Sequence, residues 1–223
     1  MENIRAGEPI TKRPSPCGSL GFFVRSKIGS IPFAVVSSHV VGRDLINRPQ
    51  AVSLKQVALN GTGDEIRECR AGVNIGTRIW CARLETTSVT EVDFALVRLN
   101  DNPNPEMPQI SQPSDYLRSA TISGQPIVAL VQRGGLRRGK FEKVLPEDRR
   151  LPFEGLADPI PYRRLHQVKY DEETAPGMSG SVVVGLEGSL RGVILGIHVG
   201  GNGKTGFFQR VDPLWERFEL YRT

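Results

Sequence analysis

The chain has 223 residues, 39% of them hydrophobic, which is enough to bury the core of one or two domains and excludes a disordered protein. Its formal net charge is +5, from 29 basic and 24 acidic residues, and so small an excess does not favour a nucleic-acid partner. No stretch approaches the ~20 apolar residues that span a bilayer, and residues 1–16 lack the apolar centre of a signal peptide. We therefore expect no contact with a membrane.

Short apolar or alternating runs, each bounded by Gly, Pro, Asn or Asp, follow one another along the chain. Runs of this length and period indicate β-strands, and the many glycines and prolines fit tight turns between them. We expect strands at residues 19–24, 33–37, 52–59, 77–84 and 93–99, and a second series at 127–132, 165–170, 181–184, 192–199 and 206–211. Such a pattern is typical of an all-β barrel or sandwich.

A proline-rich segment separates the two series of strands. Residues 100–116 contain four prolines, which exclude both a central strand and the interior of a helix. We therefore expect an N-terminal barrel at residues 1–102, a linker at 103–118 and a C-terminal barrel at 119–223.

Two segments of the second half do not fit the strand pattern. Residues 133–150 form the densest basic stretch, interrupted by acidic residues, and we interpret them as a solvated loop rather than a nucleic-acid surface. Near the end of the chain, Asp212 is a good helix N-cap and Pro213 suits the first helical position. The apolar residues that follow would share one helical face, which predicts a C-terminal helix docked on the second barrel. They are Leu214, Trp215, Phe218 and Tyr221.

The three cysteines are Cys17, Cys69 and Cys81. Their number is odd, and their spacing fits neither a zinc site nor a redox pair, so we assign them no role and expect no metal or cofactor. Secreted enzymes of this size usually carry disulfides. We expect none here, and on that basis predict a reducing, cytoplasmic location.

The sharpest motif is the run TAPGMSGS at residues 174–181, which is followed by an apolar strand. A nucleophilic serine needs a tight turn that exposes its hydroxyl, and flanking glycines allow that turn. The backbone N–H groups of Gly177 and Ser179 would then point at one spot and stabilise an oxyanion. An isolated run of this kind is also compatible with an ordinary β-turn.

A histidine and an aspartate complete the chemistry that this serine would need. His39 ends an apolar run, and Asp93 opens another. Taken singly, His39 could be a buried structural residue and Asp93 a turn cap. Together, in the order His, Asp, Ser and on two halves that share a cleft, they match a triad. In it Ser179 attacks, His39 carries the proton and Asp93 fixes the histidine tautomer.

The same segments resemble the chymotrypsin-like proteases. VVSSHVV at residues 35–41 and DFAL at 93–96 resemble the histidine and aspartate segments of HtrA/Deg-type proteases. TAPGMSG at 174–180 is similar to the nucleophile segment of picornavirus-type proteases, with Ser179 in place of the viral cysteine, and ILGIHVGGNG at 194–203 resembles their substrate-binding strand. The resemblance implies two six-stranded antiparallel β-barrels, followed here by the C-terminal α-helix. It also implies a serine endopeptidase that forms an acyl-enzyme.

The resemblance also implies a site for the substrate residue P1, which precedes the cleaved bond. His198 would donate a hydrogen bond to the carbonyl oxygen of a P1 Gln or Glu, and Thr174 would add a second. The backbone from Val199 through Gly200 to Gly201 would pair with an extended peptide. In trypsin-like enzymes the position of Glu173 selects Arg or Lys, so we rank P1 Gln first, then Glu, then a basic residue.

Three functions remain open from the sequence. The first is an intracellular serine endopeptidase that acts on a protein or peptide. Because Met178 occupies the position of the acid used by secreted zymogens, such an enzyme would be active as made or controlled by a regulatory partner protein. The second is a catalytically silent protease-fold module that binds peptide or RNA. The third is an esterase with the same triad, which a long edge strand suited to peptides argues against.

Overall fold

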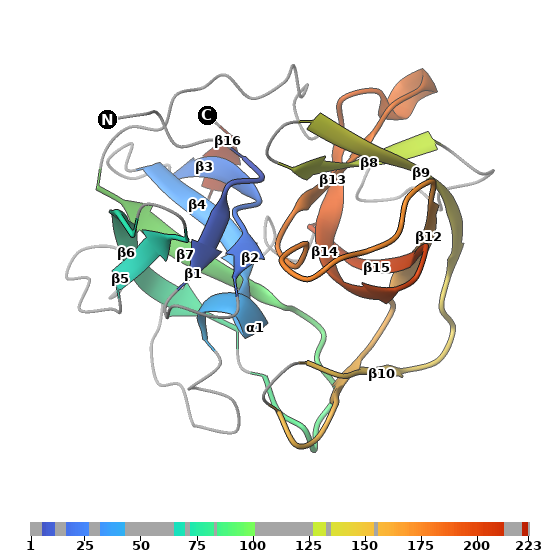
Figure 1. Cartoon of the computed structure of the whole chain (residues 1–223), viewed down its shortest axis with the longest axis horizontal. Helices are drawn as coiled ribbons and strands as arrows, with labels where there is room; N and C mark the ends of the chain where they lie inside the picture. Colours follow the sequence, from blue (N-terminus) through green and yellow to red (C-terminus); the bar gives the residue numbers. More distant parts are fainter. Residues whose placement is uncertain are drawn as a thin grey trace.

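The computed structural model describes two β-rich halves of the chain, which lie side by side in Figure 1. The described residues are 6–11, 17–26, 32–42, 65–69, 72–82, 84–100, 127–132, 135–153, 156–211 and 220–222. The strand predicted at residues 52–59 and the linker predicted at 103–118 lie outside them.

The first half is an eight-stranded sheet in the order β16-β3-β4-β7-β6-β5-β1-β2. Its strands are β1 (Pro9–Thr11), β2 (Gly18–Ser19), β3 (Phe22–Ser26), β4 (Pro32–Ser37), β5 (Glu65–Glu68), β6 (Asn74–Cys81), β7 (Phe94–Leu99) and β16 (Leu220–Arg222). The short helix α1 (Ser38–Val41) follows β4 directly. No hydrogen-bonded pairing among the described residues joins β16 to β2, so within them the sheet forms a half-barrel. Beside the barrel of the second half, it matches the two-barrel architecture that the sequence predicts.

The second half is a closed six-stranded barrel in the order β12-β15-β14-β13-β8-β9, as predicted. Its strands are β8 (Ile127–Gln132), β9 (Gly135–Val144), β12 (His166–Tyr170), β13 (Val182–Gly185), β14 (Ile194–Asn202) and β15 (Thr205–Arg210). Between β9 and β12 the chain forms a separate two-stranded hairpin of β10 (Arg149–Leu151) and β11 (Ile160–Tyr162). A short 3-10 helix, η2 (Gly188–Leu190), follows β13.

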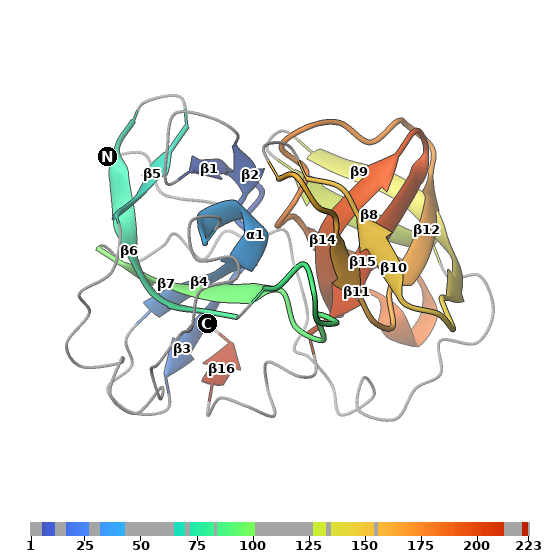
Figure 2. The same ribbon diagram turned by 90° about the horizontal axis from the view of Figure 1, so that it is seen from below.

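The continuous apolar runs of β4 and β7 are explained by burial on both faces of the first sheet. Along β4, Phe33 and Val35 join a core cluster that also contains barrel residues such as Val182 and Ile197. The intervening Ala34 and Val36 join a second cluster made only of first-half residues. Since successive side chains point to opposite faces, both faces must be apolar. The shared cluster packs the two halves against one another, and Figure 2 shows α1 on the side of the first sheet that faces the barrel.

The end of the chain differs from the prediction. Residues 212–219 lie outside the described part, but Leu220–Arg222 form strand β16, which pairs with β3 of the first sheet. The predicted helix therefore does not extend through Tyr221, and the last residues do not lie on the second barrel. Pairing with the backbone of β3 satisfies the hydrogen bonds of this segment in place of a helix.

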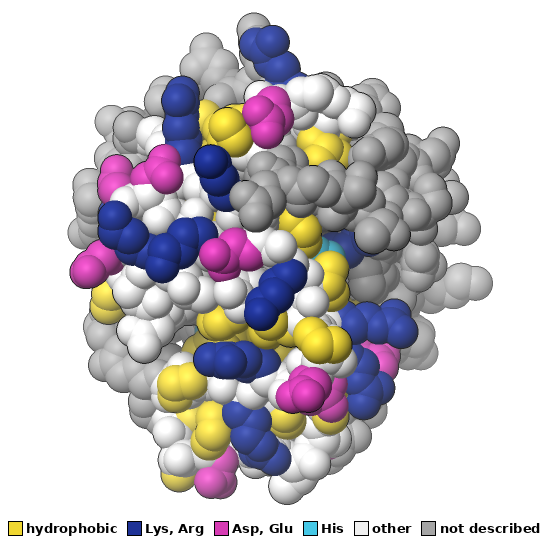
Figure 3. Space-filling model, turned by 90° about the vertical axis from the view of Figure 1, so that its right-hand side faces the viewer, with side chains coloured by type: hydrophobic (Ala, Val, Ile, Leu, Met, Phe, Trp, Pro, Cys, Tyr) yellow, Lys and Arg dark blue, Asp and Glu magenta, His cyan; other side chains and the backbone are white. Residues whose placement is uncertain are grey.

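The basic stretch at residues 133–150 is also not a loop. Most of it is strand β9, in which Gly139 and Phe141 are buried while most of the other side chains face solvent. Because most side chains of this barrel strand are polar, the sequence lacks the alternation of apolar and polar residues that indicates a strand. Figure 3 shows Lys and Arg interspersed with Asp and Glu on this side of the molecule, which is the pattern of a solvated surface.

The structure contradicts the prediction that disulfides are absent. Cys17 and Cys69 are joined by a disulfide, with 6.4 Å between their Cα atoms, while Cys81 is a buried free thiol. The pairing of β1 with both β2 and β5 brings the two cysteines together. The original reason for a cytoplasmic location therefore no longer holds. Among the described residues, no helix has the length and apolar character needed to cross a membrane.

Candidate active site

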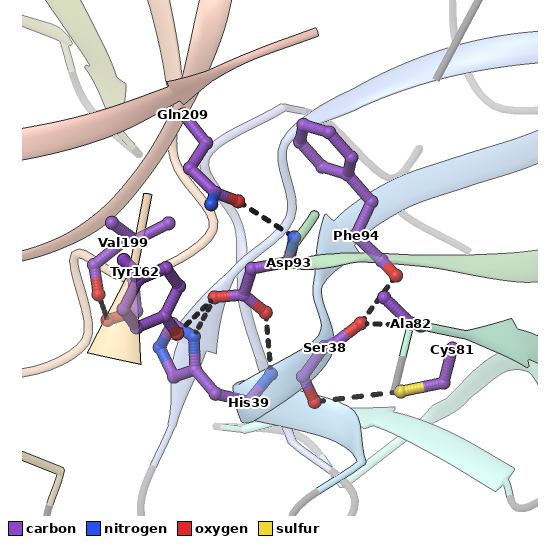
Figure 4. Close-up of polar contacts among 10 residues, drawn as sticks. Ser38, His39, Cys81, Ala82, Asp93, Phe94, Tyr162, Val199 and Gln209 are labelled. Carbon is purple, nitrogen blue, oxygen red and sulfur yellow. Dashed lines mark hydrogen bonds and ion pairs between the residues drawn. The ribbon is translucent and has the colours of Figure 1, made fainter. Parts of the chain in front are cut away.

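His39 and Asp93 form a buried hydrogen-bonded pair between α1 and the residue that precedes β7 (Figure 4). His39 Nδ1 lies 2.5 Å from Asp93 Oδ2, and the backbone N–H of His39 donates to Asp93 Oδ1 at 3.0 Å. Both side chains are almost completely buried. Two contacts to one carboxylate fix the rotation of both side chains, so Nδ1 carries a hydrogen and Nε2 is left to accept a proton.

Ser38 fixes the backbone on which His39 stands. Its hydroxyl donates to the carbonyl of Phe94 and accepts from the N–H of Ala82, while its own N–H donates to the carbonyl of Asp93 at 3.3 Å. These bonds tie the start of α1 to β7 and to the end of β6. They explain why a polar residue directly before the histidine is fully buried.

Two residues of the second half hold Asp93, and the sequence did not reveal either of them. Gln209 in β15 accepts the backbone N–H of Asp93 through Oε1 at 2.7 Å. Tyr162 in β11 donates its hydroxyl to Asp93 Oδ2 at 2.8 Å. Asp93 thus lies where the two halves meet, and its environment is built from both.

Ser179 lies in the predicted glycine-bounded turn, and the first half holds this turn. Ser19 donates its hydroxyl to the carbonyl of Gly177 at 2.7 Å and its backbone N–H to the carbonyl of Ser179 at 2.7 Å. Gly180 adopts φ = +93°, and a Cβ there would lie 2.1 Å from the carbonyl oxygen of Ser19. Only glycine allows both the turn and this close approach.

The turn leaves two backbone donors available. Within the described part of the chain, no hydrogen bond engages the N–H of Gly177 or of Ser179. The hydroxyl of Ser179 donates to the carbonyl of Val199 at 3.4 Å, and His39 Nε2 has no hydrogen-bond partner among the described residues. The serine and the histidine are therefore not hydrogen-bonded to one another in this structure.

Gly18 shows how close the His39 and Ser179 segments come. A Cβ on Gly18 would lie 2.5 Å from the side chain of Val40, which follows His39, and 2.9 Å from the carbonyl oxygen of Ser179. The segment that carries the histidine and the turn that carries the serine therefore meet at one residue. On the histidine itself, the ring of Phe153 packs at a centroid distance of 4.2 Å.

The predicted P1 residues flank a pair of glycines on β14 and β15. Gly201 pairs with Gly206, and a Cβ on Gly201 would contact Thr174, while one on Gly206 would contact His198. Thr174 donates its hydroxyl to the carbonyl of Gly203 at 2.9 Å.

His198 itself is buried. Burial, followed by the charge of His39, lowers the pKa of His198 to about 3, so its imidazole is neutral near pH 7. Its Nδ1 lies 3.5 Å from the Tyr170 hydroxyl, which leaves Nε2 as the ring's other polar atom.

The remaining predicted contacts lie on the same side of the barrel. Beyond Ile197, the edge of β14 away from β15 has no strand partner among the described residues, and Gly180 and Ser181 bond to His198 there. Val199, Gly200 and Gly201 continue along this strand. Glu173 is exposed, its carbonyl accepts from Arg137 at 2.6 Å, and its carboxylate has no partner among the described residues.

No protein-family model and no curated protein matches the chain. Solved structures do match it over nearly its whole length. A Nocardiopsis protease aligns with 99% of this chain and 99% of its own at 18% identity and a TM-score of 0.62. Thermobifida fusca protease A aligns with 98% of this chain and 97% of its own at 18% identity and a TM-score of 0.60. The chain therefore has the fold of the chymotrypsin-like serine proteases.

A third solved structure has the same fold. It is a glutamic acid-specific serine protease that uses a histidine triad in substrate binding, and it aligns with 99% of this chain and 100% of its own. Its identity to this chain is 17% and its TM-score is 0.57, so the likeness is one of fold.

Proposed function

We propose that the chain is a serine endopeptidase in which His39, Asp93 and Ser179 form the catalytic triad. The observation that carries the proposal is the buried His39–Asp93 pair. Its Nε2 atom has no hydrogen-bond partner among the described residues and belongs to a segment that meets the Ser179 turn at Gly18. A buried imidazole oriented by a carboxylate, beside a half-buried serine turn whose N–H groups no described residue engages, is the arrangement that acyl transfer requires.

The proposed reaction begins when the Ser179 hydroxyl rotates away from the carbonyl of Val199 toward His39. Oγ attacks the substrate carbonyl carbon while its proton moves to Nε2, and Asp93 balances the imidazolium that forms. The N–H groups of Gly177 and Ser179 stabilise the oxyanion. His39 then returns the proton to the leaving amine, and water repeats the cycle on the acyl-enzyme.

We infer that the preferred P1 residue is glutamine, with glutamate next and a basic residue last. Because the Thr174 hydroxyl proton is committed to the Gly203 carbonyl, its oxygen can only accept from a P1 side chain. A neutral His198 can donate, so the pair offers one donor and one acceptor, which suits an amide better than a carboxylate. The exposed position of Glu173 gives little support to a basic P1 residue.

The glutamic acid-specific relative supports the same order by contrast. That protein uses a histidine triad in substrate binding, whereas this chain has three histidines in all, one of which is His39. Across β12, β15 and β14 the residues in register are His166, Phe208 and His198. A phenylalanine separates the two histidines, so His166 does not continue the polar contacts of His198, whose Nδ1 faces the Tyr170 hydroxyl.

The cellular compartment in which the protein works is inferred from the oxidation state of its cysteines, not from the active site. We had proposed an intracellular enzyme, and a cytosolic protein of this kind would keep Cys17 and Cys69 reduced. The disulfide in the structure favours an oxidising compartment instead. Counting free thiols in the protein isolated from its native source under denaturing conditions decides between the two, since an oxidised chain has one and a reduced chain has three.

A catalytically silent module that binds peptide is the second candidate, because Ser179 and His39 are not hydrogen-bonded here. A fluorophosphonate probe separates the two functions. Labelling of the folded wild type that is lost in Ser179→Ala supports the enzyme, whereas a folded wild type that remains unlabelled supports the binding module. A peptide library cleaved by the wild type and by His198→Ala then tests the P1 site, and identical P1 profiles would remove His198 from it.

A further inference from the structure

The hydroxyl of Tyr162 contacts the carboxylate of Asp93, although the proposed reaction gives Tyr162 no task. Tyr162 Oη lies 2.8 Å from Asp93 Oδ2, and both side chains are completely buried. Figure 4 shows the phenol and the imidazole of His39 approaching the same carboxylate oxygen. Packing of the Tyr162 ring alone does not account for a buried hydroxyl that donates to the carboxylate of the proposed triad.

The donors around Asp93 divide unequally between its two oxygens. Oδ1 accepts from the backbone N–H of His39, while Oδ2 accepts from both His39 Nδ1 and Tyr162. Burial, and then the charge of Asp93, raises the pKa of Tyr162 well above its usual value, so the phenol keeps its proton and remains a donor. Within the described part of the chain, His39 is the one basic side chain within ion-pair distance of Asp93.

Strand β11 is attached to the segment that carries Asp93, which gives the contact a fixed geometry. The N–H of Thr90 donates to the carbonyl of Pro161 at 2.7 Å, and the N–H of Arg163 donates to the carbonyl of Thr90 at 3.0 Å. These two bonds enclose Tyr162. Its ring packs in a core cluster with Val199, whose carbonyl accepts from Ser179.

We propose that Tyr162 is a positioning residue of the triad, which holds the Asp93 carboxylate in line with His39 Nδ1 and shares its negative charge. The proposal rests on the proposed function. With Tyr162 in place, the carboxylate cannot rotate without losing a charge-assisted hydrogen bond, which is stronger than a neutral one. The hydrogen bond from Tyr162 also compensates part of the negative charge of Asp93, and that part does not stabilise the protonated form of His39.

The test is Tyr162→Phe, which removes the hydroxyl and keeps the ring. We expect kcat to fall roughly 10-fold or more, the loss of one hydrogen bond to a charged group, with KM changed less than about 2-fold. The acid limb of the kcat/KM profile should move to higher pH, because the less compensated carboxylate favours protonated His39 more strongly. Among the described residues, the titratable side chains that interact with the pair are Tyr162 itself and His198. The buried Arg78 donates to the carbonyl of Val41 in α1, and Arg163 pairs with Glu91 and Asp148 at the surface nearby.

The matched control is Thr90→Val. Its hydroxyl is also buried, lies on the segment that bridges to Tyr162, and has no hydrogen-bond partner among the described residues. Removing it should leave both limbs of the pH profile unchanged. If Tyr162→Phe does not fold, the wild type made with 3-fluorotyrosine serves instead. The more acidic phenol is a stronger donor, so the acid limb should move to lower pH.

A readout that needs no turnover keeps the proposal separate from the proposed function. The proton on His39 Nδ1 should give a strongly downfield proton NMR signal, and in Tyr162→Phe that signal should move further downfield. An unchanged signal together with an unchanged pH profile overturns the role of Tyr162. The two proposals can fail separately. If the wild type is not labelled by fluorophosphonate and cleaves no peptide, but the His39 signal still moves in Tyr162→Phe, the peptidase is overturned and Tyr162 remains the residue that positions Asp93.

Discussion

Gln209, in the barrel, accepts a hydrogen bond from the backbone N–H of Asp93, in the first half, across 116 residues of sequence at 2.7 Å. The N–H is buried and cannot reach water, so the amide oxygen of Gln209 is its only acceptor in the described structure. Together with Tyr162, this bond makes the position of Asp93 depend on correct docking of the two halves. The geometry of the proposed triad therefore depends on how the two halves pack together.

Replacing Gln209 with methionine should lower stability. The variant keeps the length of the side chain but leaves the Asp93 N–H unsatisfied, which should reduce the free energy of unfolding by about 1–3 kcal/mol. Urea unfolding measures the effect. Gln167→Met is the control, because Gln167 makes an exposed hydrogen bond to Glu142, and it should change stability by less than about 0.5 kcal/mol. Equal losses in the two variants would contradict the interpretation.

Asp93→Asn should fold and lose about 10⁴-fold in kcat, the loss that this change causes in a serine-protease triad. The backbone N–H of His39 donates to Oδ1, so the amide oxygen of the new side chain takes that place and its NH2 group takes the place of Oδ2. That NH2 would donate to His39 Nδ1 and move the ring hydrogen to Nε2, which could then no longer accept the serine proton. Steady-state kinetics with thermal unfolding as a folding check measure this, and turnover near that of the wild type would exclude Asp93 from the triad.

The Cys17–Cys69 disulfide should affect both stability and catalysis. Cys17 is two residues before Ser19, which holds the Ser179 turn, and a Cβ on Gly177 would lie 3.8 Å from the carbonyl oxygen of Cys17. Replacing both cysteines with serine should lower the free energy of unfolding by about 2–4 kcal/mol and reduce the rate of acylation by fluorophosphonate.

Dithiothreitol provides the control for that prediction. It should slow acylation of the wild type and leave the double variant unaffected, since Cys81 is free in both. A wild type whose acylation rate is the same in reduced and oxidised form would show that the Ser179 turn does not depend on this bond.

The strands that could be predicted best from the sequence are those in which buried side chains are continuous or alternate regularly. Residues 127–132 form β8 as expected, and the runs behind β4, β7 and β12–β15 were found because their buried positions are continuous or alternate. The order of His39, Asp93 and Ser179 then suggested a triad. Strand β9 was missed because most of its side chains face water, and β16 because three residues that pair with β3 carry no periodic signal.

Residues that act on Asp93 from the other half could not be found in this way. Tyr162 ends a three-residue strand that contains Pro161, and Gln209 is one polar residue in β15, so neither has a motif around it. Their roles exist only once β11 and β15 lie against the segment before β7. The disulfide was missed for the same reason, because the pairing of β1 with β2 and β5 is what brings its cysteines together.

His166 should make the protein less stable in acid. It lies in β12 between the rings of Phe141 and Phe208, and burial, followed by the charge of Arg210, lowers its pKa to about 4. In the unfolded chain the pKa of His166 is about 6.5. Between pH 6.5 and 4 the imidazole is therefore protonated in the unfolded state but neutral in the folded state. Stability must therefore fall as the pH falls through this window.

His166→Phe should reduce that dependence, because a phenylalanine fits among the neighbouring rings and binds no proton. Urea unfolding at pH 7, 6 and 5 should show a free energy of unfolding that declines less steeply in the variant, by up to about 1.4 kcal/mol per pH unit. His198 is unchanged in both proteins and keeps its own contribution, since its pKa is lowered to about 3. If the free energy of unfolding declines equally with pH in the two proteins, His166 binds its proton as readily in the folded state as in the unfolded state. Packing of its ring against Phe208 would then not be what keeps His166 neutral.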